Sequence, residues 1–100
     1  MAFGIGIKTQ FGITANYWKI AKVEKSKISK NAYIVLNGYE SKETKDYANL
    51  EPRFINIYPK DFDEVFGLEK INKEGMNEDK SIYEFIKNNC EEFEKAEFID

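Results

Sequence analysis

Alternating apolar and polar positions predict β-strands in the first part of the chain. Phe3, Ile5 and Ile7 alternate with two glycines, and this period of two is typical of a short strand. Three stretches rich in aromatic and β-branched residues predict further strands over 16–24, 32–39 and 53–58. The second of them begins with five consecutive apolar residues, which places it inside a sheet. Pro59 ends the third, because proline offers no hydrogen-bond donor to a β-ladder.

The first of these three stretches carries apolar side chains on both faces. Trp18 and Ile20 share one face, whereas Tyr17, Ala21 and Val23 share the other. This arrangement predicts either partial cover of both faces or a bulge within the strand. The polar residues 25–31, before the next strand, predict a hairpin loop. The polar residues 40–50, after that strand, predict a long loop or a frayed strand end.

The periodicity changes from two to three or four residues at Asp61. Asp61 and Glu64 match a capping box with Asp in place of Ser or Thr, and Gly67 is placed to end a short helix. Acidic side chains at the start of a helix favour its macrodipole. As an alternative, Asp61, Asp63 and Glu64 present oxygens to a cation, although the spacing and glycine of an EF-hand loop are missing. The apolar face of this helix comprises Phe62, Val65 and Phe66.

A longer helix of about four turns is predicted over 80–96. Asp79 or Ser81 would cap its start, and the polar stretch 72–80 before it predicts a loop. Phe98 and Ile99 then form an apolar end that we expect to dock on the same core. The apolar stripe of the helix follows spacings of three and four: Ile82, Tyr83, Phe85, Ile86, Cys90, Phe93 and Ala96.

We therefore expect one α+β domain covering residues 1–100. It would contain a mainly antiparallel sheet of three to five strands, followed by a short helix and a longer C-terminal amphipathic helix packed on one sheet face. The composition, 42% apolar and 33% charged, is that of an ordinary globular protein. No stretch approaches the roughly 18 apolar residues of a membrane-spanning helix, and the N-terminus lacks the pattern of a signal peptide. These features predict a cytoplasmic protein without a membrane partner.

The side chains that usually carry catalysis are sparse. There is no histidine, which removes the commonest general base and the commonest metal ligand. Cys90, the single cysteine, lies on the apolar helix stripe and is expected to be a core residue. Gly4 and Gly6 are not followed by the third glycine of a dinucleotide fingerprint. An enzyme would need carboxylates assembled by the tertiary structure, so we expect no catalytic activity, no metal and no cofactor.

Charge is divided unevenly between the two parts of the chain. Residues 1–60 hold ten basic and five acidic side chains, a net charge of +5. Residues 61–100 hold five basic and thirteen acidic side chains, a net charge of −8. Surfaces of opposite charge favour head-to-tail self-association. The alternative is two solvated faces that meet no partner.

A cluster of lysines and aromatics around the first hairpin suggests single-stranded nucleic-acid binding as the alternative function. Sheets that bind single strands combine basic side chains with exposed aromatic rings on which bases stack. The net charge of −3 and the presence of only one arginine, Arg53, weigh against this reading, and a solvated lysine-rich hairpin explains the same residues. The candidate contacts, within residues 17–35, are Tyr17, Trp18, Lys19, Lys22, Lys25, Lys27 and Lys30.

Several short motifs follow one another along the chain. They are Lys-Thr-Gln-Phe-Gly-Ile at 8–13, Asn-Tyr-Trp-Lys-Ile at 16–20, Tyr-Ile-Val-Leu at 33–36, Gly-Tyr-Glu-Ser-Lys-Glu at 38–43, Tyr-Glu-Phe-Ile-Lys at 83–87, Phe93, and Phe-Ile-Asp at 98–100. In this order they resemble a group of short phage and prophage proteins encoded in phage structural gene clusters, often tail clusters. Residues 69–80 have no counterpart in that pattern. The resemblance implies an assembly or virion-associated role and supplies no catalytic residues.

Codon usage adds a hint about the source. The fourteen lysines, twelve isoleucines and nine asparagines share A/T-rich codons, which indicates a low-GC genome and agrees with a prophage in a Gram-positive host. We therefore expect a non-enzymatic phage-type structural or accessory protein that binds another protein or itself. Its location would be cytoplasmic, with the virion as the alternative.

Overall fold

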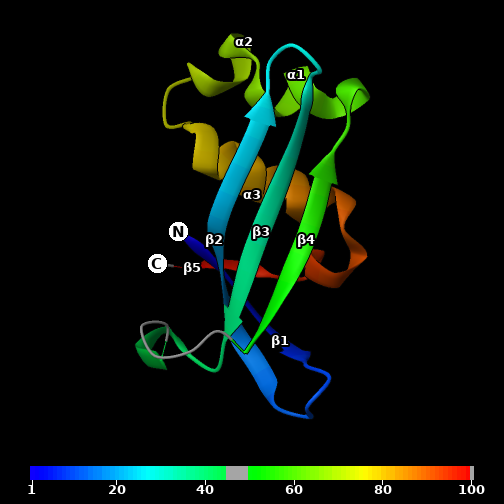
Figure 1. Cartoon of the computed structure of the whole chain (residues 1–100). Coiled ribbons are helices and arrows are strands. Elements are labelled where there is room, and N and C mark those ends of the chain that lie inside the picture. Colours follow the sequence, from blue (N-terminus) through cyan, green and yellow to red (C-terminus); the bar gives the residue numbers. More distant parts are fainter. Residues whose placement is uncertain (45–49, 100) are drawn as a thin grey trace.

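Five strands form one antiparallel sheet in the order β4-β3-β2-β1-β5 (Figure 1). The computed structural model describes residues 1–44 and 50–99. The first four strands neighbour one another in chain order, whereas β5 returns from the end of the chain to pair with β1. The strands are β1 (Ala2–Lys8), β2 (Thr14–Ser26), β3 (Asn31–Tyr39), β4 (Glu51–Ile57) and β5 (Glu97–Ile99).

Helices cover one face of this sheet and leave the other uncovered (Figure 1). All three α-helices lie between β4 and β5 in the chain, behind the layer that β2, β3 and β4 form in the figure. This arrangement confirms the α+β prediction of an antiparallel sheet followed by a short helix and a longer one. No helix in the described part of the chain has the length and hydropathy needed to span a membrane. The helical elements are η1 (Lys42–Thr44), α1 (Pro59–Phe66), α2 (Leu68–Ile71), α3 (Glu78–Asn89) and η2 (Glu91–Phe93).

Aromatic side chains from both ends of the chain meet in the core. The ring of Phe3 lies edge-on to Tyr83, with centroids 5.0 Å apart, and stacks on Phe93 at 5.1 Å. Trp18 lies edge-on to Phe93 at 5.7 Å. All four side chains are buried, and aromatic pairs contribute about 0.5–1.5 kcal/mol each beyond the area they bury. These contacts join β1, β2, α3 and η2 into one core.

A β-bulge reverses the faces of β2 partway along the strand. The pairing with β3 shifts between Ile20 and Lys22, so Ala21 has no partner in the register. Ile20 packs against the core before the shift and Val23 after it. The hydroxyl oxygen of Tyr83 accepts a hydrogen bond from the Ile20 N–H at 2.9 Å, which satisfies a donor at the irregularity. The bulge is one of the two arrangements that the two-sided apolar pattern predicts.

The loops before and after β3 have different boundaries from those predicted. The hairpin loop predicted over 25–31 is shorter, because β2 continues to Ser26 and β3 begins at Asn31. Lys30 in the turn has a φ of 52°, a left-handed conformation that closes such turns. Of the stretch 40–50, the first part contains η1, and residues 45–49 lie outside the described residues.

The first helix begins earlier than the predicted capping box. α1 starts at Pro59, follows Tyr58, and has no side-chain hydrogen bond at its cap, so the prediction of a start at Asp61 is wrong. Proline suits the first helical position, because its φ is already helical and its missing N–H needs no partner. Gly67 ends α1 as predicted, since a Cβ there would lie 2.4 Å from the Asp63 carbonyl oxygen.

The second part of the helical region also differs from its prediction. Asn77 caps α3, with its side-chain oxygen accepting from the Lys80 N–H at 2.9 Å, so neither Asp79 nor Ser81 serves as the cap. Asn is among the most favourable capping residues, and α3 therefore begins inside the predicted loop 72–80. The hydroxyl of Ser81 is buried instead and donates to the Val65 carbonyl at 2.5 Å, which joins α3 to α1.

The predicted helix over 80–96 is wrong in its second half. α3 ends at Asn89, and Cys90 is extended with φ −112° and ψ 112°. The Lys87 ammonium then donates to the carbonyl oxygens of Glu94 and Ala96, at 2.8 and 2.6 Å, and holds the returning chain against the helix. The final residues, expected as a docked apolar end, form β5 and pair with β1. The apolar residues after Asn89 continue the spacing of a helix because the side chains of the turn and those of α3 fill the same core.

Candidate functional site

The aromatic residues proposed for nucleic-acid contact lie in the interior. Tyr17 is 2% exposed and Trp18 is 0% exposed, so neither ring offers a surface on which a base could stack. The indole N–H of Trp18 donates to the Ala15 carbonyl at 3.1 Å. A Cβ at Gly38 would lie 2.6 Å from the Trp18 ring, so the glycine makes room for the indole. The sequence-based assignment of these two rings to a binding surface is therefore corrected.

The five lysines proposed with them are divided among three places. Lys19 and Lys22 lie on the uncovered face of β2, where their register partners are Asn37 and Val35. Lys25 points to the covered face, because the bulge shifts the alternation, and its ammonium pairs with Glu78 on α3 at 2.9 Å. The remaining two, Lys27 and Lys30, lie in the turn between β2 and β3.

The guanidinium of Arg53 is also engaged within the molecule. Its Nε lies 2.7 Å from a Glu92 carboxylate oxygen, a second nitrogen pairs with Glu51, and the group sits 5.2 Å from the centre of the Trp18 ring. This guanidinium lowers the pKa of the Glu51 carboxyl through a side-chain hydrogen bond. The one arginine of the chain is therefore held by two carboxylates on the covered side of the sheet.

Part of the opposite charge in the two parts of the sequence is paired within one molecule. Three ion pairs join the basic first part of the chain to the acidic last part: Lys25–Glu78 at 2.9 Å, Lys30–Asp63 at 3.1 Å and Arg53–Glu92 at 2.7 Å. Such exposed pairs contribute about 0–1 kcal/mol each. Opposed charge alone is thus a weak argument for self-association, because part of it is already used in packing the helices on the sheet.

The groups considered for chemistry do not converge. Across the described residues, no three Asp, Glu, Cys or His side chains lie together as a metal site would need. Asp63 of the proposed acidic cation group pairs with Lys30. Cys90 packs against the core, and burial, followed by the nearby charge of Glu92, raises the pKa of its thiol. A raised thiol pKa means less thiolate and therefore a poorer nucleophile.

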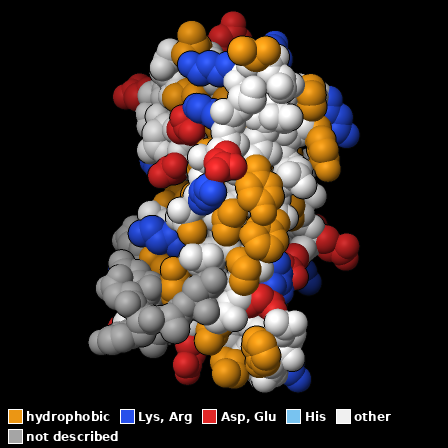
Figure 2. Space-filling model, in the orientation of Figure 1, with side chains coloured by type: hydrophobic (Ala, Val, Ile, Leu, Met, Phe, Trp, Pro, Cys, Tyr) orange, Lys and Arg blue, Asp and Glu red, His pale blue; other side chains and the backbone are white. Residues whose placement is uncertain are grey.

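The uncovered sheet face carries a stacked aromatic pair that sequence reasoning did not assemble. The rings of Tyr33 and Phe54 are 5.8 Å apart and nearly parallel, with an angle of 9° between them. They come from neighbouring strands, where Val35 is the register partner of Phe54. Phe54 is 59% exposed, which is unusual for a phenylalanine and reflects the lack of a covering element on its side of the sheet. We call Tyr33, Val35 and Phe54 the aromatic face, and Figure 2 shows it as an apolar area near the middle of the molecule.

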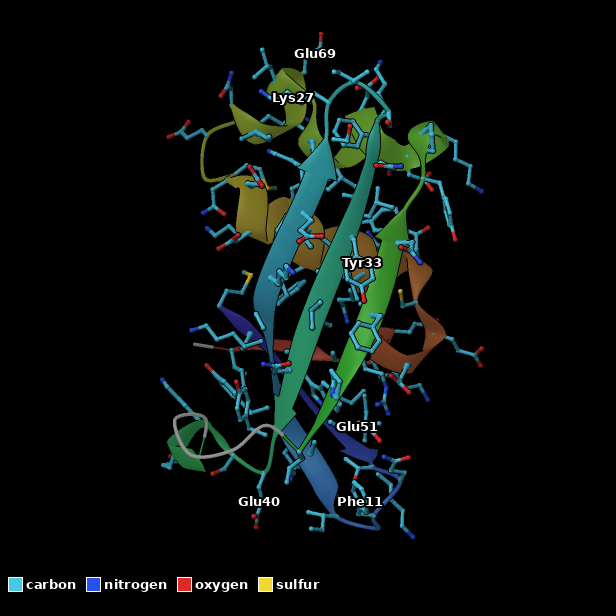
Figure 3. The ribbon with its side chains drawn as sticks, viewed as in Figure 1. Phe11, Lys27, Tyr33, Glu40, Glu51 and Glu69 are labelled. Carbon is cyan, nitrogen blue, oxygen red and sulfur yellow. The ribbon has the colours of Figure 1, made fainter. Side chains whose placement is uncertain are left out.

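Charged and polar groups border the aromatic face. Lys22 and Glu24 form an exposed ion pair at 2.8 Å on the adjoining strand, and this hydrogen bond to Glu24 raises the pKa of Lys22. A hollow of about 370 Å³ opens beside Tyr33, and Asn56 and Tyr58 contribute to its walls. Tyr33 lies at the centre of this side of the molecule in Figure 3. The result is an apolar centre with a polar rim, the general anatomy of a protein interface.

The signal for this face was present in the sequence but incomplete. Strand alternation puts Tyr33 and Val35 on one side of β3 and Phe54 on one side of β4. Whether those two sides coincide depends on the register between the strands, which the sequence does not specify. A scan of protein-family models, a search of curated proteins and a search of solved structures each found no match to this chain. The function is therefore argued from the site itself.

Proposed function

We propose that this chain is a non-enzymatic protein-binding module, of the phage structural or accessory type, that docks another protein on the aromatic face. The observation that carries the proposal is the pairing of the exposed Phe54 with the half-buried Tyr33, on a sheet face that no helix of the described residues covers. Contiguous exposed apolar areas with polar rims mark interaction sites on soluble proteins. The sequence motifs that resemble phage structural proteins support an assembly setting, in the cytoplasm or on a virion.

The face suits a protein better than a nucleic acid. Tyr33 and Phe54 lie beside each other with nearly parallel rings, whose centroids are 5.8 Å apart, so the two side chains form one continuous apolar area. The nearest lysine, Lys22, is paired with Glu24, whose carboxylate would repel a phosphate backbone. Aromatic residues with few net charges are instead enriched at the centre of protein interfaces. The partner is expected to present an apolar surface with polar groups around it.

The face is a better docking element than the free edge of the sheet. In the described part of the chain, β4 is an edge strand with no neighbour on its outer side. Pro52 lies within β4 and has no N–H, and a proline on an edge strand discourages the addition of another strand. The ring of Phe54, in contrast, projects from the sheet and offers area without requiring backbone pairing.

Photo-crosslinking from a single position tests the proposal. A photo-reactive amino acid at position 54, in cells that produce the protein, should crosslink to one discrete partner of a different sequence. The same group at position 28 should not capture that partner. Ile28 is the matched control, because it is 97% exposed but lies in the turn beyond the sheet face. The purified partner should then bind Phe54→Ser about 10- to 100-fold more weakly than wild type, and bind Ile28→Ser equally well.

Two results would count against it. A crosslinked partner whose affinity is the same for wild type and Phe54→Ser would remove the aromatic face from the interaction. Binding of a single-stranded oligonucleotide that weakens with salt and is lost in Phe54→Ser would favour the nucleic-acid alternative, because counterion release makes such binding salt-dependent.

A further inference from the structure

One end of the molecule presents a phenylalanine on a rigid turn. Phe11 is 74% exposed at the tip of the turn between β1 and β2 (Figure 3). The Thr9 N–H and hydroxyl both donate to the Ile13 carbonyl, at 2.9 and 2.7 Å, and the Gly12 N–H donates to the Thr9 carbonyl at 3.0 Å. Gly12 has a φ of +82°, which favours glycine. An apolar side chain held by a hydrogen-bonded turn loses little conformational freedom when it binds.

The opposite end contains an apolar pocket. It has a volume of about 320 Å³ and lies between the β2–β3 hairpin and the α1–α2 junction. Phe62 and Phe66 are two of its walls, with ring centroids 5.0 Å apart, and Leu68, which is 74% exposed, is a third. Lys25, Lys27, Asp63 and Gly67 complete the lining, and the Lys25 ammonium lies 4.9 Å from the centre of the Phe66 ring. This space accommodates a phenyl group, which would contact two aromatic rings and one aliphatic side chain.

We propose that Phe11 of one copy inserts into this pocket of the next copy, so that the chain assembles head to tail. The two features belong to one molecule and lie at opposite ends of it, and its longest dimension is 39 Å. A contact between two different surfaces of the same chain is heterologous, and it grows into a ring or a filament instead of stopping at a dimer. Successive copies would repeat at close to the long dimension of one molecule.

Charge at the two ends agrees with a second copy as the occupant. Lys27 at the pocket rim forms no ion pair within the residues that the structure describes. At the Phe11 end, the carboxylate of Glu40 is likewise without an ion-pair partner among those residues, and Glu51 is nearby, accepting from the Gln10 N–H at 3.3 Å. Neither end carries one sign of charge, since Asp63, paired with Lys30, also lines the pocket and Lys8 ends β1 just before the Phe11 turn. The unpaired Lys27 and Glu40 are nevertheless opposite in charge, and a contact between them would favour this orientation.

This contact goes beyond the proposed function, because it uses neither Tyr33 nor Phe54. An assembled chain would keep the aromatic face of every copy open to another protein. The two ideas are therefore tested by different substitutions. If Phe54→Ser loses self-association and Phe11→Ser keeps it, self-association belongs to the aromatic face, and the head-to-tail contact is overturned.

Mixing two complementary variants is the decisive experiment. Phe11→Ser removes the inserted ring but keeps the pocket, and Leu68→Ser damages the pocket but keeps the ring. In light scattering over a dilution series, the wild-type chain should grow beyond a dimer with concentration. Each variant alone should associate about 10- to 100-fold more weakly, but an equimolar mixture should form a heterodimer and stop there. Only a heterologous contact predicts this rescue.

The controls keep the outcome interpretable. Ile28→Ser removes an apolar side chain at the pocket end that is 97% exposed, compared with 74% for Phe11 and Leu68. This variant should assemble like wild type, because Ile28 does not line the pocket. Phe11 and Leu68 are both mostly exposed, so circular dichroism and urea unfolding should show folded variants with little change in stability. A wild-type chain that remains monomeric, a wild-type chain that stops at a dimer, or a mixture that stays monomeric overturns the proposal.

Discussion

The hydrogen bond from the β2 bulge to Tyr83 gives a stability prediction with two separate signatures. The Tyr83 side chain is 2% exposed, and its hydroxyl oxygen accepts the Ile20 N–H at 2.9 Å. Tyr83→Phe keeps the ring and its packing on Phe3 but removes this acceptor. A partly buried donor left without a partner costs about 1–2 kcal/mol, so the free energy of unfolding at pH 8 should fall by that amount.

The second signature is the dependence of this difference on pH. Burial, which outweighs the hydrogen bond from Ile20, raises the pKa of Tyr83 to about 12, compared with 10.0 for an exposed tyrosine. Because the folded pKa is the higher one, the stabilisation is complete below pH 10 and is lost as pH rises toward 12. At pH 11.5 the wild-type chain should have lost about 2 kcal/mol on this account, whereas Tyr83→Phe loses nothing from this position. The advantage of wild type should therefore shrink above pH 10 and vanish near pH 11.5.

Urea unfolding followed by tryptophan fluorescence measures both signatures. Trp18 is the only tryptophan and is completely buried, so its emission reports the folded core. Tyr33→Phe is the matched control for the loss of a tyrosine hydroxyl, because its ring lies on the uncovered face, and at pH 8 it should change the free energy of unfolding little. A difference between wild type and Tyr83→Phe that stays constant from pH 8 to pH 11.5 would refute the reasoning, as would a loss below about 0.5 kcal/mol at pH 8.

Two further substitutions test the local structure. Gly38→Ala should destabilise the fold by about 1–3 kcal/mol in urea unfolding, because its Cβ would lie 2.6 Å from the buried Trp18 ring; an unchanged midpoint and emission spectrum would contradict this contact. Asn77→Ala should lower the free energy of unfolding by about 1 kcal/mol, because it removes the cap of α3. Asn72→Ala, just after α2, is the control and should lower it less. Equal effects of the two substitutions in thermal unfolding would show that the cap is not stabilising.

Local sequence patterns predicted the strands well because strand formation here depends on residues that are neighbours in the chain. The alternation in β1, the apolar run in β3 and the stop at Pro59 all depend on neighbours in the chain. The two-sided pattern of β2 pointed to a bulge for the same reason: a strand whose apolar side chains change faces must shift its register or be covered twice. What the pattern did not contain was the acceptor on Tyr83, which is supplied from far along the chain.

The end of the chain was mispredicted because different backbones can place the same side chains in one core. Phe93 and Ala96 are buried, as a helical stripe requires, yet they are presented from η2 and the turn that follows it. No glycine or proline marks the end of α3. The competing interaction is the pairing of β5 with β1, where Phe98 is the register partner of Phe3. Pairing between residues so far apart in sequence overrides a helical periodicity that is only local.

The candidate site depended on register in the same way. Its five lysines are exposed, as residues of a solvated hairpin would also be. Tyr17 and Trp18 were placed with them because aromatic residues beside lysines resemble a binding surface. Burial of these two rings decides against that role. Alternation alone could not do so, because consecutive residues of a strand project to opposite faces and here both rings are buried. Phe54 was placed in its strand, but its stacking on Tyr33 follows only from the β3–β4 register.

The uncovered face is a consequence of the topology. In the sheet order β4-β3-β2-β1-β5, β4 and β5 are the two edge strands, so the chain leaving β4 must cross the sheet to reach β5. That crossing carries every α-helix of the described chain, and it passes over one face only. Within the described residues, the aromatic pair on the other face therefore has no helix to pack against. An apolar stack retained at such a position has a clear use if a second protein supplies the missing layer.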